Sequence, residues 1–231
     1  MVKSEPRDVG GQAGVMSSDT SSSAAHRRAH AVWLLVALAV LVISIIPLEH
    51  QPGKWESNLF YAVNRLPDVL FIPLWVLMQA GNIAAPIIAG VVAMVARRVR
   101  LAFDLVVAGG SAWVLATVVK AAVDRGRPAE LLDDVLLRSA PRAGHGYVSG
   151  HSAVAAALAA AVTPYLSRRW RVTVWVVAVS VAFARVYMGA HLPLDVVGGT
   201  AMGWALGSLV HVLMGDPEWG RSGRATGGSS D

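Results

Sequence analysis

The 231-residue chain contains no cysteine, and only 15% of its residues are charged. The absence of cysteine excludes disulfide bonds and thiolate metal sites, and it is compatible with either side of a membrane. Hydrophobic residues make up 55% of the chain and fall in long uninterrupted blocks. Such blocks indicate an integral membrane protein that forms one domain.

The chain also lacks a basic segment of the kind that binds nucleic acid, although its formal net charge is +5. A nucleic-acid-binding protein gathers its basic residues on a soluble face. Here the lysines and arginines separate apolar blocks instead. We therefore expect membrane lipids around the protein and no nucleic-acid partner, and no oligomeric state follows from the sequence.

Both ends of the chain are polar. Residues 1–30 hold a Gly/Ser-rich tract and the basic flank "HRRAH", with too little apolar content to fold alone, so we expect a disordered cytoplasmic tail. Residues 215–231 include "RSGRATGGSSD" and are expected to form a flexible C-terminal tail. The membrane domain, 31–214, opens with "AVWLLVALAVLVISIIPL", which is longer than a usual signal-peptide core and has no small-residue cleavage pattern after it. We expect a retained first membrane helix.

The other apolar blocks set the expected fold. They lie at about 66–80, 82–96, 101–119, 151–167, 172–190 and 193–214. A spanning helix takes about 20 mostly apolar residues, with roughly 17 as the lower limit. The block 66–80 is short and contains two prolines, so we expect a short interfacial or re-entrant helix there. The sequence thus predicts an all-α, polytopic membrane helical bundle with six transmembrane helices.

Three arginine clusters predict the topology, because short cytoplasmic loops collect lysine and arginine. If 66–80 does not cross the membrane, all three arginine clusters fall on the same side. If 66–80 does cross, the first cluster lies on the side opposite the other two. We therefore expect a plasma-membrane protein with cytoplasmic termini and with the connection 120–150 outside. The clusters are Arg27 and Arg28; Arg97, Arg98 and Arg100; and Arg168, Arg169 and Arg171.

Three polar stretches, "KAAVDRGRP", "SGH" and "RVYMGAHLPLD", stand where apolar blocks begin or end on the expected outer side. In the first, Lys120 and Arg127 are seven residues apart, a spacing that returns nearly to the same face of a helix. In the second, Ser149 stands in the position of a helix N-cap. With six spans, all these helix ends face the same water. Their polar and capping residues are Lys120, Arg127, Ser149, Gly150, His151, Arg185, His191 and Asp195.

Three cations, two histidines, a carboxylate and a helix N-terminus are suited to cleaving a phosphate ester without a metal or another cofactor. Arginine binds phosphate oxygens in pairs, lysine adds a point charge, and backbone N–H groups at a helix start accept an anion. Groups fixed in this way stabilise the charge that develops in the transition state. Both histidines have ordinary pKa values near neutrality, as proton transfer at neutral pH requires.

The pattern K-x6-R-P, S-G-H and R-x5-H-x3-D resembles the three-part signature of the type 2 phosphatidic acid phosphatase superfamily, which contains the lipid phosphate phosphatases. All spacings within the motifs hold, and the signature with its helices covers about residues 100 to 214. Two neighbouring positions differ from the family pattern: Val148 stands where proline is usual, and Ala184 where serine is usual. A more flexible turn at Val148 would alter the shape of the phosphate pocket.

The resemblance implies an integral membrane lipid phosphate phosphatase that acts through a phosphohistidine without a metal. It implies His191 as the nucleophile, Asp195 as the acceptor of its other ring proton, and His151 as the general acid and later the general base. The implied substrate is a lipid phosphate or pyrophosphate. The implied phosphate-binding residues are Lys120, Arg127, Arg185, Ser149 and Gly150.

Three other functions remain open at this point. A polyprenyl pyrophosphate phosphatase of carrier-lipid recycling would use the same mechanism. An anion transporter would place its charges near the membrane midplane on broken helices, whereas here they gather at helix ends. A metal hydrolase would use His145, His151, His191 and Asp195 as ligands, although their spacings fit no common zinc motif.

Some polar residues outside the signature have simpler interpretations. We expect His145 to be a solvated loop residue and His211 to be structural. Asp104 follows Arg100 by four residues, so the two are expected to pair near the inner membrane surface.

Overall fold

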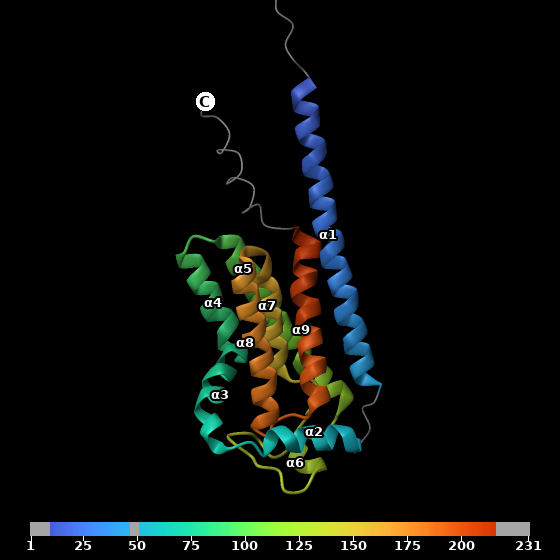
Figure 1. Ribbon diagram of the computed structural model, residues 1–231, viewed down its shortest axis with the longest axis vertical. Coiled ribbons are helices and arrows are strands. Elements are labelled where there is room, and N and C mark those ends of the chain that lie inside the picture. Colours follow the sequence, from blue (N-terminus) through green and yellow to red (C-terminus); the bar gives the residue numbers. More distant parts are fainter. Residues whose placement is uncertain (1–9, 47–50, 216–231) are drawn as a thin grey trace, which may run out of the picture.

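The computed structural model describes residues 10–46 and 51–215, which form helices and connecting segments without a strand. The long helices lie side by side in a bundle, and shorter ones cover one end of it (Figure 1). Within these residues, three 3-10 turns join the helices, at Asp68–Leu70, Gln79–Gly81 and Thr163–Tyr165. The α-helices are α1 Gly10–Ile45, α2 Lys54–Asn64, α3 Phe71–Met78, α4 Ala84–Val95, α5 Val99–Val123, α6 Pro128–Leu131, α7 Gly150–Val162, α8 Arg168–Tyr187 and α9 Pro193–Met214.

Helices α7 and α9 form the centre of the bundle. Most residues of the alanine-rich α7 are buried, and α9 presents Gly199, Gly203 and Gly207 to it. A Cβ atom on Gly199 would overlap the carbonyl oxygen of Ser149, and one on Gly203 would overlap that of Ala153. Small residues let membrane helices approach to backbone contact in this way. The contact fixes the N-terminal end of α7, which carries the second motif.

Helices α4, α5, α7, α8 and α9 alternate in direction, so the motif-bearing helix ends meet (Figure 1). The C-terminal ends of α5 and α8 and the N-terminal ends of α7 and α9 lie at one end of the bundle, which α2 crosses (Figure 1). The connections α4–α5 and α7–α8, with their arginines, lie at the opposite end (Figure 1). The expected gathering of the three motifs at one end of a helical bundle is therefore observed.

The expected number of spans is not confirmed. Among residues 10–46 and 51–215, four helical segments are long and apolar enough to cross a membrane. There are five if the bent pair Lys54–Asn64 and Asp68–Gly81, which bends by 79°, counts as one span. The two short helices in the expected set, α4 and α7, have 12 and 13 residues, fewer than the roughly 17 a span usually needs. The block 66–80 does hold a short helix, α3.

The expected polar tails are only partly described. Helix α1 begins at Gly10, so residues 10–30 of the tail that we expected to be disordered are helical in the structure. Residues 10–26 lead directly into the apolar segment Arg27–Ile45 of the same helix, which is a candidate membrane span. Residues 1–9 of the first tail and residues 216–231 of the C-terminal tail lie outside the described residues.

Candidate active site

A cavity of about 250 Å³ lies where the motif-bearing helix ends meet. Its wall also includes Asn82 and Trp113, from the segments before α4 and within α5. Of the eight site residues predicted from the sequence, six line this cavity, and Ser149 and Asp195 lie behind its wall. The six are Lys120, Arg127, Gly150, His151, Arg185 and His191.

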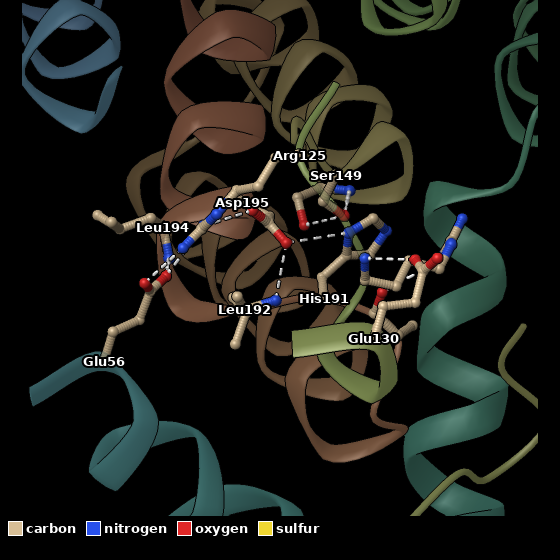
Figure 2. Close-up of polar contacts among 11 residues, drawn as sticks. Glu56, Arg125, Glu130, Ser149, His191, Leu192, Leu194 and Asp195 are labelled. Carbon is tan, nitrogen blue, oxygen red and sulfur yellow. Dashed lines mark hydrogen bonds and ion pairs between the residues drawn. The ribbon is translucent and has the colours of Figure 1, made fainter. Parts of the chain in front are cut away.

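The first motif supplies two cations from either side of a chain reversal. Lys120 lies in the last turn of α5, and Arg127 precedes α6. The Arg127 guanidinium donates through Nη1 to the carbonyl oxygen of Ala190 at 3.0 Å. Its backbone N–H donates to Oε2 of Glu130 at 2.9 Å, which also accepts from the N–H of Gly144 at 3.0 Å (Figure 2). The segment around Arg127 is thereby tied both to its own loop and to the α8–α9 turn.

Arg185 reaches the cavity from the last turn of α8. It is 7% exposed, and its Nη1 lies 3.0 Å from the sulfur of Met78 on α3. Within the described residues, the Nε–H groups of Arg127 and Arg185 are buried and have no hydrogen-bond partner. Because a buried unpaired donor is costly, these groups favour an oxyanion in the cavity.

In the second motif, Ser149 caps helix α7, whereas Gly150 and His151 line the cavity. Ser149 is fully buried, and its Oγ accepts a hydrogen bond from the Ser152 hydroxyl at 3.0 Å. It is the N-cap of α7, as expected, and its backbone N–H donates to the carbonyl oxygen of Asp195 at 2.9 Å. The side chain of Ser149 thus holds α7 and is not on the cavity wall. Gly150 and His151 are the members of this motif that line the cavity.

The third motif places a buried histidine beside a buried carboxylate. His191 is 1% exposed, and its Nδ1 lies 3.6 Å from Oδ2 of Asp195 (Figure 2). This distance exceeds that of a hydrogen bond. Oδ2 instead accepts from the N–H of Leu192 at 2.8 Å, which ties Asp195 to the start of α9. The Asp195 carboxylate therefore lies on the Nδ1 side of the His191 ring, and Nε2 is the more distant ring nitrogen.

The surroundings of His191 favour its neutral form. Burial, followed by the positive charges of Arg185, Lys120 and Arg127, holds the pKa of His191 well below its ordinary value. A neutral imidazole retains the lone pair that a nucleophile needs.

Two charged residues that were not predicted as site residues, Glu56 and Arg125, extend the site away from the cavity. Arg125 donates through Nη1 to Oδ1 of Asp195 at 2.9 Å, and through Nη2 to Oε2 of Glu56 at 2.6 Å (Figure 2). Oε1 of Glu56, which comes from α2, accepts the N–H of Leu194 at 3.0 Å. Glu56, Phe60 and Asn64 form the buried face of α2. Their regular spacing of four residues is the sequence signal that Glu56 faces the protein interior.

His145, the remaining residue considered as a metal ligand, lies apart from this arrangement. His145 is half exposed, and its Nδ1 lies 2.9 Å from Oδ1 of Asp124. Among residues 10–46 and 51–215, no group of three or more histidine, aspartate or glutamate side chains is placed to hold a metal ion. Val148 and Ala184, the two departures from the family pattern, are both fully buried in apolar clusters.

A second cavity, of about 410 Å³, adjoins the first through Asn82. Apart from Asn82 and Gln79, it is lined by four small or aliphatic residues of α4. These are Ala84, Ala85, Ile88 and Ala89. An apolar surface therefore leads away from the polar cavity along the outside of the bundle.

These features define a membrane-helix bundle with a cationic, histidine-containing cavity at one end. The model of the PAP2 superfamily matches residues 101–219, just over half of the chain, and the chain belongs to this superfamily. The matched segment contains all three motifs.

Individual members of the superfamily are similar to this chain. A lipid A 1-phosphatase of Rhizobium johnstonii is 37% identical over 94 residues, which cover 39% of this chain and 38% of the relative. The match thus spans little more than a third of that relative's length. An undecaprenyl-diphosphatase of Sulfolobus acidocaldarius is 29% identical over 193 residues, which cover 80% of this chain and 90% of the relative.

Two solved structures share the fold. Aquifex aeolicus LpxE has a TM-score of 0.64 and 23% sequence identity, covering 68% of this chain and 95% of that one. A PAP2-type phosphatidylglycerolphosphate phosphatase from Bacillus subtilis has a TM-score of 0.64 and 20% identity, covering 78% of this chain and 95% of that one. The likeness shows that the helices follow the arrangement of membrane proteins of this superfamily.

Proposed function

We propose that the protein is an integral membrane phosphatase that removes the terminal phosphate of a lipid phosphate or lipid diphosphate through a phosphohistidine intermediate. The observation that carries the proposal is the cavity in which Lys120, Arg127 and Arg185 surround His151 and His191. The cavity lies at one end of a membrane-helix bundle, where the phosphate of a lipid resides. The apolar surface that adjoins it at Asn82 supports a substrate with a hydrocarbon chain.

In the first step, Nε2 of His191 attacks phosphorus, and the bond between phosphorus and the lipid oxygen breaks. His151 donates a proton to that oxygen as it leaves. The three cations and the backbone N–H groups at the start of α7 hold the phosphoryl oxygens, whose charge they stabilise in the transition state. Asp195 stabilises the positive ring of His191 from the Nδ1 side, as the acid of a catalytic triad does.

In the second step, a water molecule attacks the phosphorus of the phosphohistidine. His151, now deprotonated, accepts a proton from the water, and the bond between phosphorus and Nε2 breaks. Inorganic phosphate leaves, and both histidines return to their starting states.

A polyprenyl diphosphate is the second candidate substrate. The alignment with the Sulfolobus acidocaldarius undecaprenyl-diphosphatase, over 80% of this chain, favours it. The chemistry at the terminal phosphorus would be the same, but the leaving group would be a polyprenyl phosphate in place of an alcohol.

A phosphate-release panel on the purified protein tests the function. The substrates are phosphatidate, phosphatidylglycerol phosphate and a polyprenyl diphosphate, with soluble sugar phosphates as controls. We expect release from at least one lipid in the presence of a chelator and inhibition by vanadate, which mimics five-coordinate phosphorus. Loss of all activity on chelation, with recovery on adding a divalent ion, would contradict the metal-free mechanism.

We also propose that the cavity faces the extracytoplasmic side of the plasma membrane and that both termini are cytoplasmic. The arginine-rich connections at the opposite end of the bundle support this orientation. Single cysteines at positions 98, 135 and 169 can be treated with a membrane-impermeant reagent on intact cells, because the chain has no cysteine of its own. We expect labelling at 135 alone, and labelling at 98 and 169 but not 135 would reverse the orientation.

A further inference from the structure

We infer that Glu56 and Arg125 are positioning residues for phosphoryl transfer, which hold the carboxylate of Asp195 and its charge beside His191. The inference rests on the proposed function. Neither residue lines the cavity, and Glu56 lies outside the segment that matches the superfamily. The amphipathic helix α2 would then be a part of the catalytic apparatus.

The contacts form a continuous buried chain from α2 to the reacting ring. Glu56 is 1% exposed and Arg125 is 5% exposed. Nη1 of Arg125 lies 3.2 Å from Oε1 of Glu56 and 2.9 Å from Oδ1 of Asp195. Its Nη2 lies 2.6 Å from Oε2 of Glu56, so both carboxylates share one guanidinium (Figure 2).

This series of contacts fixes the orientation of the Asp195 carboxylate. Arg125 holds Oδ1, and the N–H of Leu192 holds Oδ2, the oxygen that lies 3.6 Å from Nδ1 of His191. A hydrogen bond of this kind measures about 2.7–3.2 Å, so an approach of roughly 0.5 Å would close it. Glu56 also accepts the N–H of Leu194, so α2 holds the first turn of α9, on which Asp195 lies.

The charges explain why two acids accompany one arginine. When Nε2 of His191 attacks phosphorus, its ring becomes positive, and Asp195 stabilises that charge. Arg125 alone would oppose it, because a cation beside Asp195 cancels the carboxylate's field at the ring. The negative charge of Glu56 offsets Arg125, so the three residues together carry a net negative charge. Such effects are strong in a buried, low-dielectric setting.

A purely structural ion pair would make a different prediction. It would hold α2 to the bundle, and its loss would lower stability without changing the turnover of the molecules that remain folded. Glu56→Gln separates the two roles, because the amide keeps the size of the side chain and an oxygen for the N–H of Leu194 while it removes the charge. We expect kcat to fall roughly 10- to 100-fold with KM changed by less than about threefold, the pattern of an interaction made in the transition state.

The effect should depend on Asp195, because Glu56 acts through it. In an Asp195→Asn background, Glu56→Gln should lower the rate by less than about twofold further, a strong departure from additivity. Single-turnover formation of the phosphoenzyme from a labelled aryl phosphate measures these slow variants. As a conservative rescue, Arg125→Lys should keep more activity than Arg125→Gln, because it keeps the charge.

Tyr61→Phe is the matched control on the same helix. It removes a hydroxyl that donates to the carbonyl oxygen of Asp133 at 2.6 Å, away from Asp195. We expect a lower melting temperature and an unchanged kcat. The inference fails if Glu56→Gln keeps wild-type kcat, or if it costs the same factor with and without Asp195. A wild-type protein inactive on every lipid phosphate would instead overturn the proposed function itself.

Discussion

Two buried aspartates lie at opposite ends of the bundle and differ in what surrounds them. Asp104 on α5 and Asp195 on α9 are both fully buried, and each pairs with an arginine at 2.9 Å. Asp104 also accepts the hydroxyl of Tyr165 at 2.6 Å. Its partner Arg100 donates to backbone carbonyls at the end of α9. Arg100 thus ties α5 to the end of α9, and Asp104 ties α5 to the turn that follows α7.

Asp195 has a neighbour of another kind. Its carboxylate lies beside His191, a titratable ring that lines a cavity together with cations. Burial and an arginine partner are therefore common to both aspartates and do not distinguish a structural ion pair from a catalytic one. What distinguishes them is whether the carboxylate also contacts a group that can react. Variants at the two ends should accordingly lose different properties.

The largest difference in activity is expected between histidine variants at the two ends of the bundle. His191→Ala removes the proposed nucleophile and should abolish phosphate release from lipid and aryl phosphates alike. His151→Ala removes only proton transfer, so it should lose about 10²- to 10⁴-fold with a lipid phosphate. With an aryl phosphate, whose leaving group needs little protonation, it should accumulate phosphohistidine. Rapid quench with labelled aryl phosphate measures the acid-labile, base-stable label.

His211, at the opposite end, is the control for these variants. It is fully buried and lies within 3.0 Å of the carbonyl oxygen of Ala161. His211→Gln should lower the melting temperature and leave kcat unchanged. Label trapped on the His191→Ala protein, but never on the His151→Ala protein, would show that the two roles are the reverse of those proposed.

The aspartates themselves provide the next test. Asp195→Asn should lower kcat by about 10²- to 10⁴-fold, because the amide does not stabilise the positive ring of His191. Asp104→Asn should leave kcat unchanged and cost about 1–3 kcal/mol of unfolding free energy, because it weakens the bonds from Arg100 and Tyr165. Steady-state kinetics and thermal unfolding in detergent measure both. Equal losses of kcat in the two variants would remove the distinction drawn between the two ends.

Local contacts and the gathering of motifs were predictable from the sequence. The pair of Arg100 and Asp104 is confirmed, because a spacing of four residues brings two side chains together on any helix. The convergence of the three motifs follows from helices that alternate in direction. Glu56 was not predictable in its role, because it lies 69 residues from Arg125 and only tertiary packing joins them.

Helix lengths were predicted less well, because apolar residues continue past the ends of helices. The apolar block at 151–167 suggested one span, but α7 ends at Val162 and a 3-10 turn containing Pro164 follows. Proline lacks the N–H that would continue an α-helix. The block 82–96 likewise begins at the turn around Asn82, before α4 starts. A hydropathy profile detects runs of apolar residues, but it does not mark the positions at which a helix begins or ends within such a run.

A smaller effect on stability and kcat is expected from variants at the contact between α7 and α9. Gly203→Ala would place a Cβ against the backbone of α7 at Ala153, so we expect a loss of about 1–3 kcal/mol in unfolding free energy and a lower kcat, because the start of α7 lines the cavity. A Cβ on Gly110 in α5 meets nothing within 4 Å. Gly110→Ala should therefore keep kcat and gain up to about 1 kcal/mol. Thermal unfolding measures the stability of both variants, and steady-state kinetics measure their kcat. If Gly203→Ala and Gly110→Ala behaved alike, α7 and α9 would tolerate separation.

The smallest expected effect is on the pH dependence of kcat/KM. The groups facing His191 are Lys120, Arg127, His151, Arg185 and Asp195, from the surrounding helix ends. Burial first, and then the cations among them, lower the pKa of His191, so its neutral, nucleophilic form persists as pH falls. The acid limb for an aryl phosphate should therefore lie below the ordinary histidine value of about 6.5.

Removing one of these cations should move that limb in a defined direction. In Lys120→Gln the protonated ring loses a repelling neighbour, so the pKa of His191 rises and the acid limb shifts to higher pH, by up to about one unit. Arg168→Gln removes an exposed cation at the opposite end of the bundle and should cause no shift. Comparing both variants with the wild type on one substrate cancels the substrate's own ionisation. A shift to lower pH in Lys120→Gln, or equal shifts in both variants, would contradict control of His191 by the charges around the cavity.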